Sequence, residues 1–260
     1  PERVHLGIRI MLKCLGVTRA LVGIEENKPD ALERMRATAP KDLDVEIVGL
    51  RVRYPQGAEK MLIQSLLDRE VPSGGLPADV GVLVQNVASV ATIAEAFETG
   101  LPLIERIVTV TGNGVRKPAN LIVPVGTLLE DLIAACGGLT DDAAEVVLGG
   151  PMMGTAVSNL KAPVMKGTTG VVVLTKSEVR PRDSLPCIRC GHCLDSCPVF
   201  LNPQLLGSLA RSGEVEEMTR HNLWDCMLCG CCSYVCPSNI PLSQMFQASK
   251  DAARRLEAKG

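Results

Sequence analysis

The sequence predicts a multidomain protein of the α/β and α+β classes that ends in a mainly helical domain. Three observations predict this fold class. Strand and helix patterns alternate over residues 1–103, a β-hairpin and a helix occupy residues 104–179, and two runs of cysteines joined by a helical insert occupy residues 180–260. Alternating strands and helices favour a parallel sheet, whereas a hairpin followed by a helix favours a mixed α+β module.

The composition is that of a globular protein. Hydrophobic residues make up 46% of the 260 residues and charged residues 22%, which is enough apolar surface for packed cores. A net charge of −2 with 2% aromatic residues excludes the basic patches and stacking platforms of nucleic-acid-binding proteins. No apolar run approaches the ~20 residues that span a bilayer, and no signal peptide is visible. The chain opens in a helical pattern without an initiator Met, so we expect an N-terminal truncation.

The first part has the pattern of a β-α-β unit. Apolar residues at helical spacing predict a helix over 2–15 that ends at Gly16. Further elements follow in alternation: strands at 18–25, 45–52 and 80–85, and helices at 29–38, 56–68 and 87–99. Consecutive strands with a helix between them imply a parallel sheet.

The middle part is predicted to be a β-grasp-like module. Strands at 104–111 and 120–125 flank a loop that contains Asn113-Gly114, a strong hairpin signal. A helix is predicted at 128–136, because Thr127 and Glu130 have the spacing of a capping box and Gly137 follows the last turn. Short strands at 145–148 and 170–174 complete the module, and the polar segment 176–186, with two prolines, predicts a linker.

Two cysteine runs with one shared spacing carry the strongest functional signal. In each run, two residues separate the first three cysteines from one another. Three further residues precede a fourth cysteine, which is followed by proline. In bacterial two-cluster ferredoxins of this spacing, the fourth cysteine binds the other cluster. The pattern predicts one 4Fe–4S cluster on Cys187, Cys190, Cys193 and Cys236, and a second on Cys226, Cys229, Cys232 and Cys197. Such crossed ligation holds the two clusters close together, which suits rapid electron transfer. Helices are predicted between the runs at 203–225 and after them at 241–258.

The alternative interpretation of the cysteines is a pair of zinc sites. Zinc needs four ligands from two Cys-x2-Cys pairs, and this leaves the third cysteine and the Cys-Pro of each run unexplained. Cys231 is a further cysteine beside a predicted ligand, and we interpret it as a small buried residue, with a ligand exchange as the alternative. Cys14 and Cys136 lie on apolar helix faces and are expected in the cores.

Three other segments are candidates for ligand binding. The segment 149–154 is rich in glycine but lacks the spacing of a nucleotide-binding loop, so it predicts a tight turn, with packing against a cofactor or a neighbouring domain as the alternative. The loops 54–60 and 85–89 each follow a predicted strand and precede a helix. Ligands of α/β sheets bind at the carboxyl ends of strands. The two loops are therefore expected to meet at one sheet edge, where a phosphate-bearing cofactor could bind; capped turns are the alternative.

Several of these segments together resemble one family, the C subunit of the Rnf ion-translocating electron-transport complex. The resemblance covers essentially the whole chain and is carried by GIEENKPDAL, YPQGAEKMLI, REVPSGGLPADVGVLVQNV, PLIERIVTVTG, GGPMMG, CIRCGHC and CGCCSYVCPSNIPL. The chain is also similar to cobalamin reductases of the same superfamily. More distantly, residues 18–100 resemble the flavin subunit of respiratory NADH dehydrogenase.

The resemblance implies a Rossmann-like FMN- and NADH-binding domain over 1–103, an SLBB β-grasp domain over 104–179 and a ferredoxin-like domain over 180–260. It implies that Gly57, Glu59, Lys60, Gln85 and Asn86 line the flavin and nucleotide pocket. The glycine-rich flavin loop of the family lies upstream of anything present here, so FMN binding is expected to need that region. The family further implies a peripheral subunit on the cytoplasmic side of the membrane, with other subunits, NADH and possibly ferredoxin as its partners.

Two other functions remain open at this point. A flavin and iron–sulfur cobalamin reductase would use the same cofactors. A relay scaffold without its own flavin would use the clusters alone.

Overall fold

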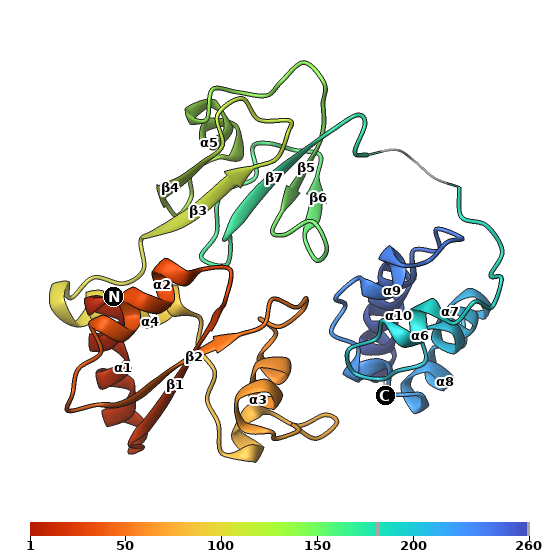
Figure 1. Cartoon of the computed structure of the whole chain (residues 1–260). Helices are drawn as coiled ribbons and strands as arrows, with labels where there is room; N and C mark the ends of the chain where they lie inside the picture. The colour runs from red at the N-terminus through yellow and green to blue at the C-terminus, as the bar shows by residue number, and fades with distance from the viewer. Residues whose placement is uncertain (180–182, 259–260) are drawn as a thin grey trace. The chain divides into compact units, whose positions relative to one another are not determined.

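The computed structural model describes residues 1–179 and 183–258 and divides the chain into two compact units, Pro1–Leu103 and a second that begins at Ile104 (Figure 1). The predicted boundary at 179/180 adjoins residues 180–182, which lie outside the described residues. The sheet and the helical region of the second unit are each described by themselves below.

The first unit is built on two parallel strands, β1 (Arg19–Glu25) and β2 (Asp44–Leu50), which pair in register from Arg19–Asp44 to Glu25–Leu50. Helix α2 (Pro29–Ala37) connects the strands and begins with a proline in its first turn, where the missing N–H costs nothing. The predicted β-α-β unit is thus confirmed. Helix α3 (Glu59–Leu67) packs on β1, where Gly23 leaves room for its leucine side chains.

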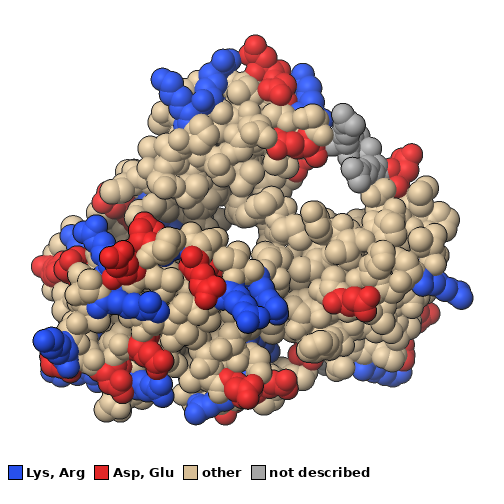
Figure 2. Space-filling view, viewed as in Figure 1, with Lys and Arg blue, Asp and Glu red and all other residues tan. Residues whose placement is uncertain are grey.

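The outer layer of the first unit is a helix pair. Helices α1 (Glu2–Leu15) and α4 (Val87–Thr99) pack tightly along their lengths, and each ends at a left-handed glycine, Gly16 and Gly100. Gly7 permits the close approach, because a β-carbon there would lie 2.0 Å from the carbonyl oxygen of Val90. Figure 2 shows basic and acidic side chains interspersed over the visible face of this unit.

The prediction of a strand at 80–85 is wrong, because these residues pair with no other strand. A 3₁₀ turn, η1 (Pro77–Val80), occupies its start, and the Val82 amide donates back to the carbonyl of Pro77. Residues 82–86 then run on into α4 outside any strand. A strand needs a neighbouring backbone to pair with, and apolar alternation alone does not provide one.

The second unit opens with a five-stranded sheet in the order β4-β3-β7-β5-β6. Strand β3 (Glu105–Thr111) pairs antiparallel with β4 (Ala119–Pro124) and parallel with β7 (Gly170–Thr175), so the predicted hairpin is confirmed. Strand β5 (Ala143–Leu148) lies between β7 and the short β6 (Thr155–Val157), which the sequence did not predict. The segment 149–154 is the tight turn between β5 and β6, closed by a hydrogen bond from the Gly154 amide to the Gly150 carbonyl.

Helix α5 (Leu129–Ala135) covers the sheet and buries Leu129, Leu132 and Ile133 in its core. The predicted capping box is wrong. The amides of Leu129 and Glu130 donate to the carbonyls of Ala162 and Leu160, and the Thr127 hydroxyl donates to Pro124. A neighbouring segment thus satisfies the first helical amides, and the side-chain cap is not needed.

The rest of the chain is helical, as predicted. Short helices α6 (His192–Asp195) and α9 (Cys231–Tyr234) lie within the two cysteine runs. Between the runs are α7 (Pro203–Ser212), α8 (Val215–Arg220) and η2 (Leu223–Asp225), and α10 (Leu242–Glu257) ends the chain. The core of this region consists of Leu206, Met218, Leu223, Cys232, Ile240, Leu242 and Phe246.

Candidate iron–sulfur centres

The two cysteine runs fold as a backbone repeat. Arg189 and Leu228 both adopt φ +56° between the first two cysteines of their run. Gly191 and Gly230 then adopt φ +85° and +82°, a left-handed conformation that favours glycine, and each begins a one-turn helix. Phe200 and Asn239 repeat a positive φ after the fourth cysteine. The spacing of the cysteines is therefore matched by a repeated loop that places the first three cysteines of each run around one pocket.

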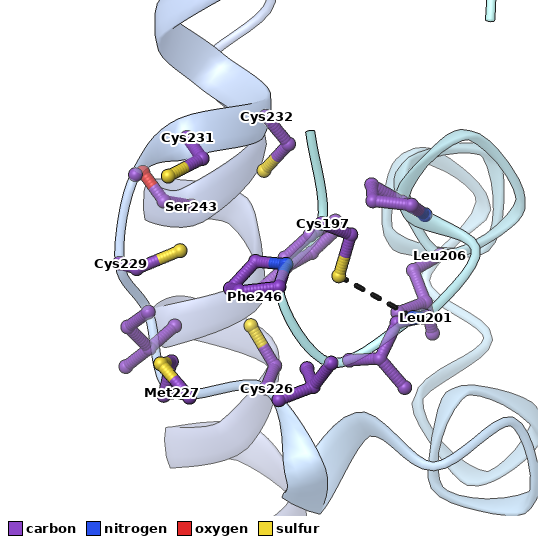
Figure 3. A pocket seen from close by; sticks show the side chains of 15 residues that line it. Cys197, Leu201, Leu206, Cys226, Met227, Cys229, Cys231, Cys232, Ser243 and Phe246 are labelled. Atoms are coloured by element: carbon purple, nitrogen blue, oxygen red, sulfur yellow. Dashed lines mark hydrogen bonds between the residues drawn. The ribbon is translucent and has the colours of Figure 1, made fainter. Parts of the chain in front are cut away.

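The first of two cysteine pockets is enclosed and apolar. Its lining includes Cys197 of the first run with Cys226, Cys229 and Cys232 of the second. Figure 3 shows the sulfur atoms of these four cysteines turned toward the space between them. The walls are mainly apolar side chains, among them Leu201, Leu206, Leu228 and Phe246. We call this the enclosed site.

The second cysteine pocket is open and more polar. Its lining includes Cys187, Cys190 and Cys193 of the first run with Cys236 of the second. Cys187 and Cys190 are exposed, whereas Cys229 and Cys232 of the enclosed site are buried. The polar part of the lining is Arg189, Gln204, Ser208, Arg211 and Ser238. We call this the open site.

The structure thus brings together the same two sets of four cysteines that the ferredoxin spacing predicts. The fourth cysteine of each run lies with the first three of the other run. Backbone amides also point at sulfur: the Leu201 amide donates to Cys197 Sγ at 3.3 Å, and the Arg189 amide donates to Cys187 Sγ at 3.4 Å. Hydrogen bonds to the sulfur ligands are one of the features by which a protein tunes an iron–sulfur cluster.

Each site offers four thiols, the donor set of a 4Fe–4S cluster. Within the described ranges, no three His, Cys, Asp or Glu side chains are close enough to bind one metal ion. Four thiols around a common space fit a cluster, whose thiolate ligands surround a larger body. Burial, and then the nearby Cys226 and Cys229, raise the pKa of Cys232 to about 12. Burial likewise raises the pKa of Cys226 and of Cys193, and the positive charge of a bound metal would favour their thiolate form.

The remaining cysteines have different surroundings. Cys231 lines the enclosed site beside Cys229, and burial is the main cause that raises its pKa to about 11. Cys136 is buried in the core of the sheet, as expected. The expectation for Cys14 is wrong, because Cys14 is exposed in the last turn of α1, beyond the buried His5, Gly7 and Ile8.

A buried lysine beside the enclosed site was not predicted from the sequence. Lys250 of α10 is 7% exposed, and its ammonium donates to the carbonyls of Trp224 at 3.1 Å and Cys226 at 2.5 Å. It also lies 5.7 Å from the centre of the Trp224 ring. The available signal was helical spacing: Phe246, Lys250 and Ala253 lie on one face of α10, and the residues on either side of Lys250 in this row are apolar.

The predicted flavin-pocket residues lie at two helix N-termini. Gly57 and Glu59 are exposed at the start of α3, where Lys60 is half-buried, and Gln85 and Asn86 are exposed at the start of α4. Helix α3 contacts β1 and η1, whereas α4 packs on α1. The side chain of Asn86 accepts a hydrogen bond from the Ala88 amide and so caps α4. The loop 85–89 follows no strand. The prediction that both loops lie at the carboxyl ends of strands of one sheet is therefore wrong.

Comparison with known protein families matches all three parts of the chain. Residues 1–95 match the model described as the Nuo51 FMN-binding domain, residues 107–156 match the SLBB domain and residues 183–240 match the 4Fe-4S dicluster domain. The predicted flavin-type, SLBB and two-cluster domain types are thereby confirmed, and so is the expectation of FMN and 4Fe–4S cofactors at the level of these families.

Curated relatives carry the resemblance over most of the chain. The C subunit of the proton-translocating ferredoxin:NAD(+) oxidoreductase complex of Clostridium ljungdahlii is 48% identical over 225 residues, 86% of this chain and 49% of that protein. The C subunit of the ion-translocating oxidoreductase complex of Rhodobacter capsulatus is 44% identical over 250 residues, 96% of this chain and 48% of that protein. The chain belongs to this family of C subunits. A third member, from Pseudomonas aeruginosa, is 43% identical over 97% of this chain and 33% of that protein.

The chain spans about half the length of the first two curated C subunits it matches. In the part of the chain that the structure describes, no helix is long and apolar enough to cross a membrane.

Proposed function

We propose that this chain transfers electrons between an NADH- and FMN-binding site in residues 1–103 and two 4Fe–4S clusters in residues 180–260, with the SLBB domain over 104–179 between them in sequence. When bound, such clusters accept and donate single electrons. One cluster is ligated by Cys187, Cys190, Cys193 and Cys236, and the other by Cys226, Cys229, Cys232 and Cys197. The observation that carries the proposal is the pair of four-cysteine pockets, each completed by the other run.

The protein works within a membrane complex that couples electron transfer to ion translocation. The printed names of the relatives support this, since they describe C subunits of ion-translocating and ferredoxin:NAD(+) oxidoreductase complexes. Other subunits, NADH and ferredoxin are the partners that follow. The protein is peripheral on the cytoplasmic side of the membrane, where NADH is available.

Cluster content tests the proposal most simply. Anaerobically reconstituted protein should hold about eight irons and about eight sulfides per chain, as two 4Fe–4S clusters require. Zinc with negligible iron in the purified and reconstituted protein would overturn it.

The flavin and nicotinamide site is proposed to include Gly57, Glu59, Lys60, Gln85 and Asn86, which rests on the match of residues 1–95 to an FMN-binding domain. Asn86→Ser keeps an oxygen that can cap α4 while removing the amide group. Lys60→Ala and Asn86→Ser, made in the longest form of the protein, should weaken FMN or NADH binding measured by flavin fluorescence, with iron content unchanged. Exposed Glu33→Ala on α2 is the matched control. Unchanged affinity in both variants would place the pocket elsewhere.

A further inference from the structure

The cysteine repeat extends into the helices that follow each run. Arg211 stands as far after Cys187 as Lys250 stands after Cys226. The two cations nevertheless have different surroundings: Arg211 is exposed on α7 and lines the open site, whereas Lys250 is buried on α10. One repeat position therefore carries a solvated charge at one site and a desolvated charge at the other.

The ammonium of Lys250 is fixed to the backbone of a proposed ligand. It donates to the carbonyls of Trp224 and Cys226, and the Trp224 ring covers it on one side. Solvent screening is weak at a buried position, so a charge there acts over a longer distance than a charge in water. Arg254 lies 5.6 Å from the centre of the same ring but is exposed, and it forms an ion pair with Asp251, the residue next to Lys250 in the chain.

We infer that Lys250 is an electrostatic positioning residue that raises the reduction potential of the cluster in the enclosed site. This inference rests on the proposed cluster ligation. Reduction adds one electron to an already anionic cluster, and the apolar walls of the enclosed site disfavour the added negative charge. The fixed cation offsets that cost. The enclosed cluster therefore remains reducible although it is shielded from water, whereas the open cluster depends on solvent and exposed arginines.

The test separates charge from hydrogen bonding. Lys250→Gln keeps a donor but removes the charge, Lys250→Arg keeps the charge, and Arg211→Gln makes the neutralising change at the equivalent position of the open site. Potentiometric titration followed by EPR gives the potentials of both clusters, and iron and sulfide are assayed on the same samples. Cys197→Ser and Cys236→Ser each remove a cysteine from only one of the two sites, and their spectra assign each signal to the enclosed or the open site.

Lys250→Gln should make reduction of one cluster about tenfold less favourable, which for a one-electron couple is a fall of about 59 mV. The other cluster should change less than about twofold. Lys250→Arg should stay near the wild-type potential, and Arg211→Gln should shift the other cluster only slightly because its charge is solvated.

Two results would overturn the inference. One is a Lys250→Gln protein with full iron content and unchanged potentials. The other is a Lys250→Gln protein that loses one cluster while Lys250→Arg keeps it, since the lysine would then hold the fold and not tune the cluster. Wild-type protein that binds no iron would instead overturn the proposed function itself.

Discussion

The enclosed site and the open site have the same backbone repeat and different walls. Where the enclosed site has Phe246, the equivalent position of the open site is Gly207, and where it has Leu228, the open site has Arg189. The cysteine spacing and the left-handed residues set the loop geometry in both. The two sites thus share the cysteine pattern that predicts cluster binding and differ in the side chains around it.

The largest expected effect is a loss of stability on truncation of Phe246, the side chain that distinguishes the lining of the enclosed site. Phe246 is 1% exposed and belongs to the core of the helical region. Phe246→Ala should lower the free energy of unfolding by about 3–5 kcal/mol, because it leaves a cavity in a core. Anaerobic denaturant titration measures this. The neighbouring Gln247→Ala, at an exposed position of the same helix, should change stability by less than about 0.5 kcal/mol. A loss below about 1 kcal/mol for Phe246→Ala would show that the residue is not the centre of this core.

Iron removal should follow the difference in exposure. The open site exposes Cys187 and Cys190, whereas Cys229 and Cys232 of the enclosed site are buried. A chelator can reach the enclosed cluster only after local opening of its walls, so we expect two phases of iron loss that differ on the order of tenfold in rate. Absorbance during anaerobic chelation follows both phases. A single phase that releases all the iron would contradict the difference between the sites.

A smaller effect is expected at the helix that follows each run. Helix α7 begins with Asn202, whose side chain accepts from the Leu205 amide at 3.0 Å, whereas the equivalent Pro241 of α10 provides no side-chain cap. Asn202→Ala should cost about 1 kcal/mol of unfolding free energy, and Asn202→Ser should recover most of it. Equal stability of the alanine and serine variants would mean that the cap contributes nothing measurable.

Local signals in the sequence predicted much of this fold. The glycine after α1 located the end of that helix, since a left-handed glycine acts on the backbone within one turn. The cysteine spacing predicted both sets of four, because the repeat fixes which thiols face one another.

The predictions failed where segments distant in the sequence determine the local structure. Residues 80–85 lack a partner strand, and the amides at the start of α5 are satisfied by the segment around Leu160 instead of by Thr127. The short strand β6 depends on its pairing with β5. Helical spacing in α10 indicates that Lys250 faces the core, but its contacts with Trp224 and the Cys226 backbone appear only in the structure.

The crossed assignment of the fourth cysteines is the central claim, and one pair of substitutions tests it. Cys197 belongs to the first run but lines the enclosed site, and Cys236 belongs to the second run but lines the open site. Chelation kinetics with EPR on anaerobically reconstituted Cys197→Ser and Cys236→Ser should show loss of the slowly chelated cluster in the first variant and of the rapidly chelated cluster in the second. Loss of the rapidly chelated cluster in Cys197→Ser would contradict the account.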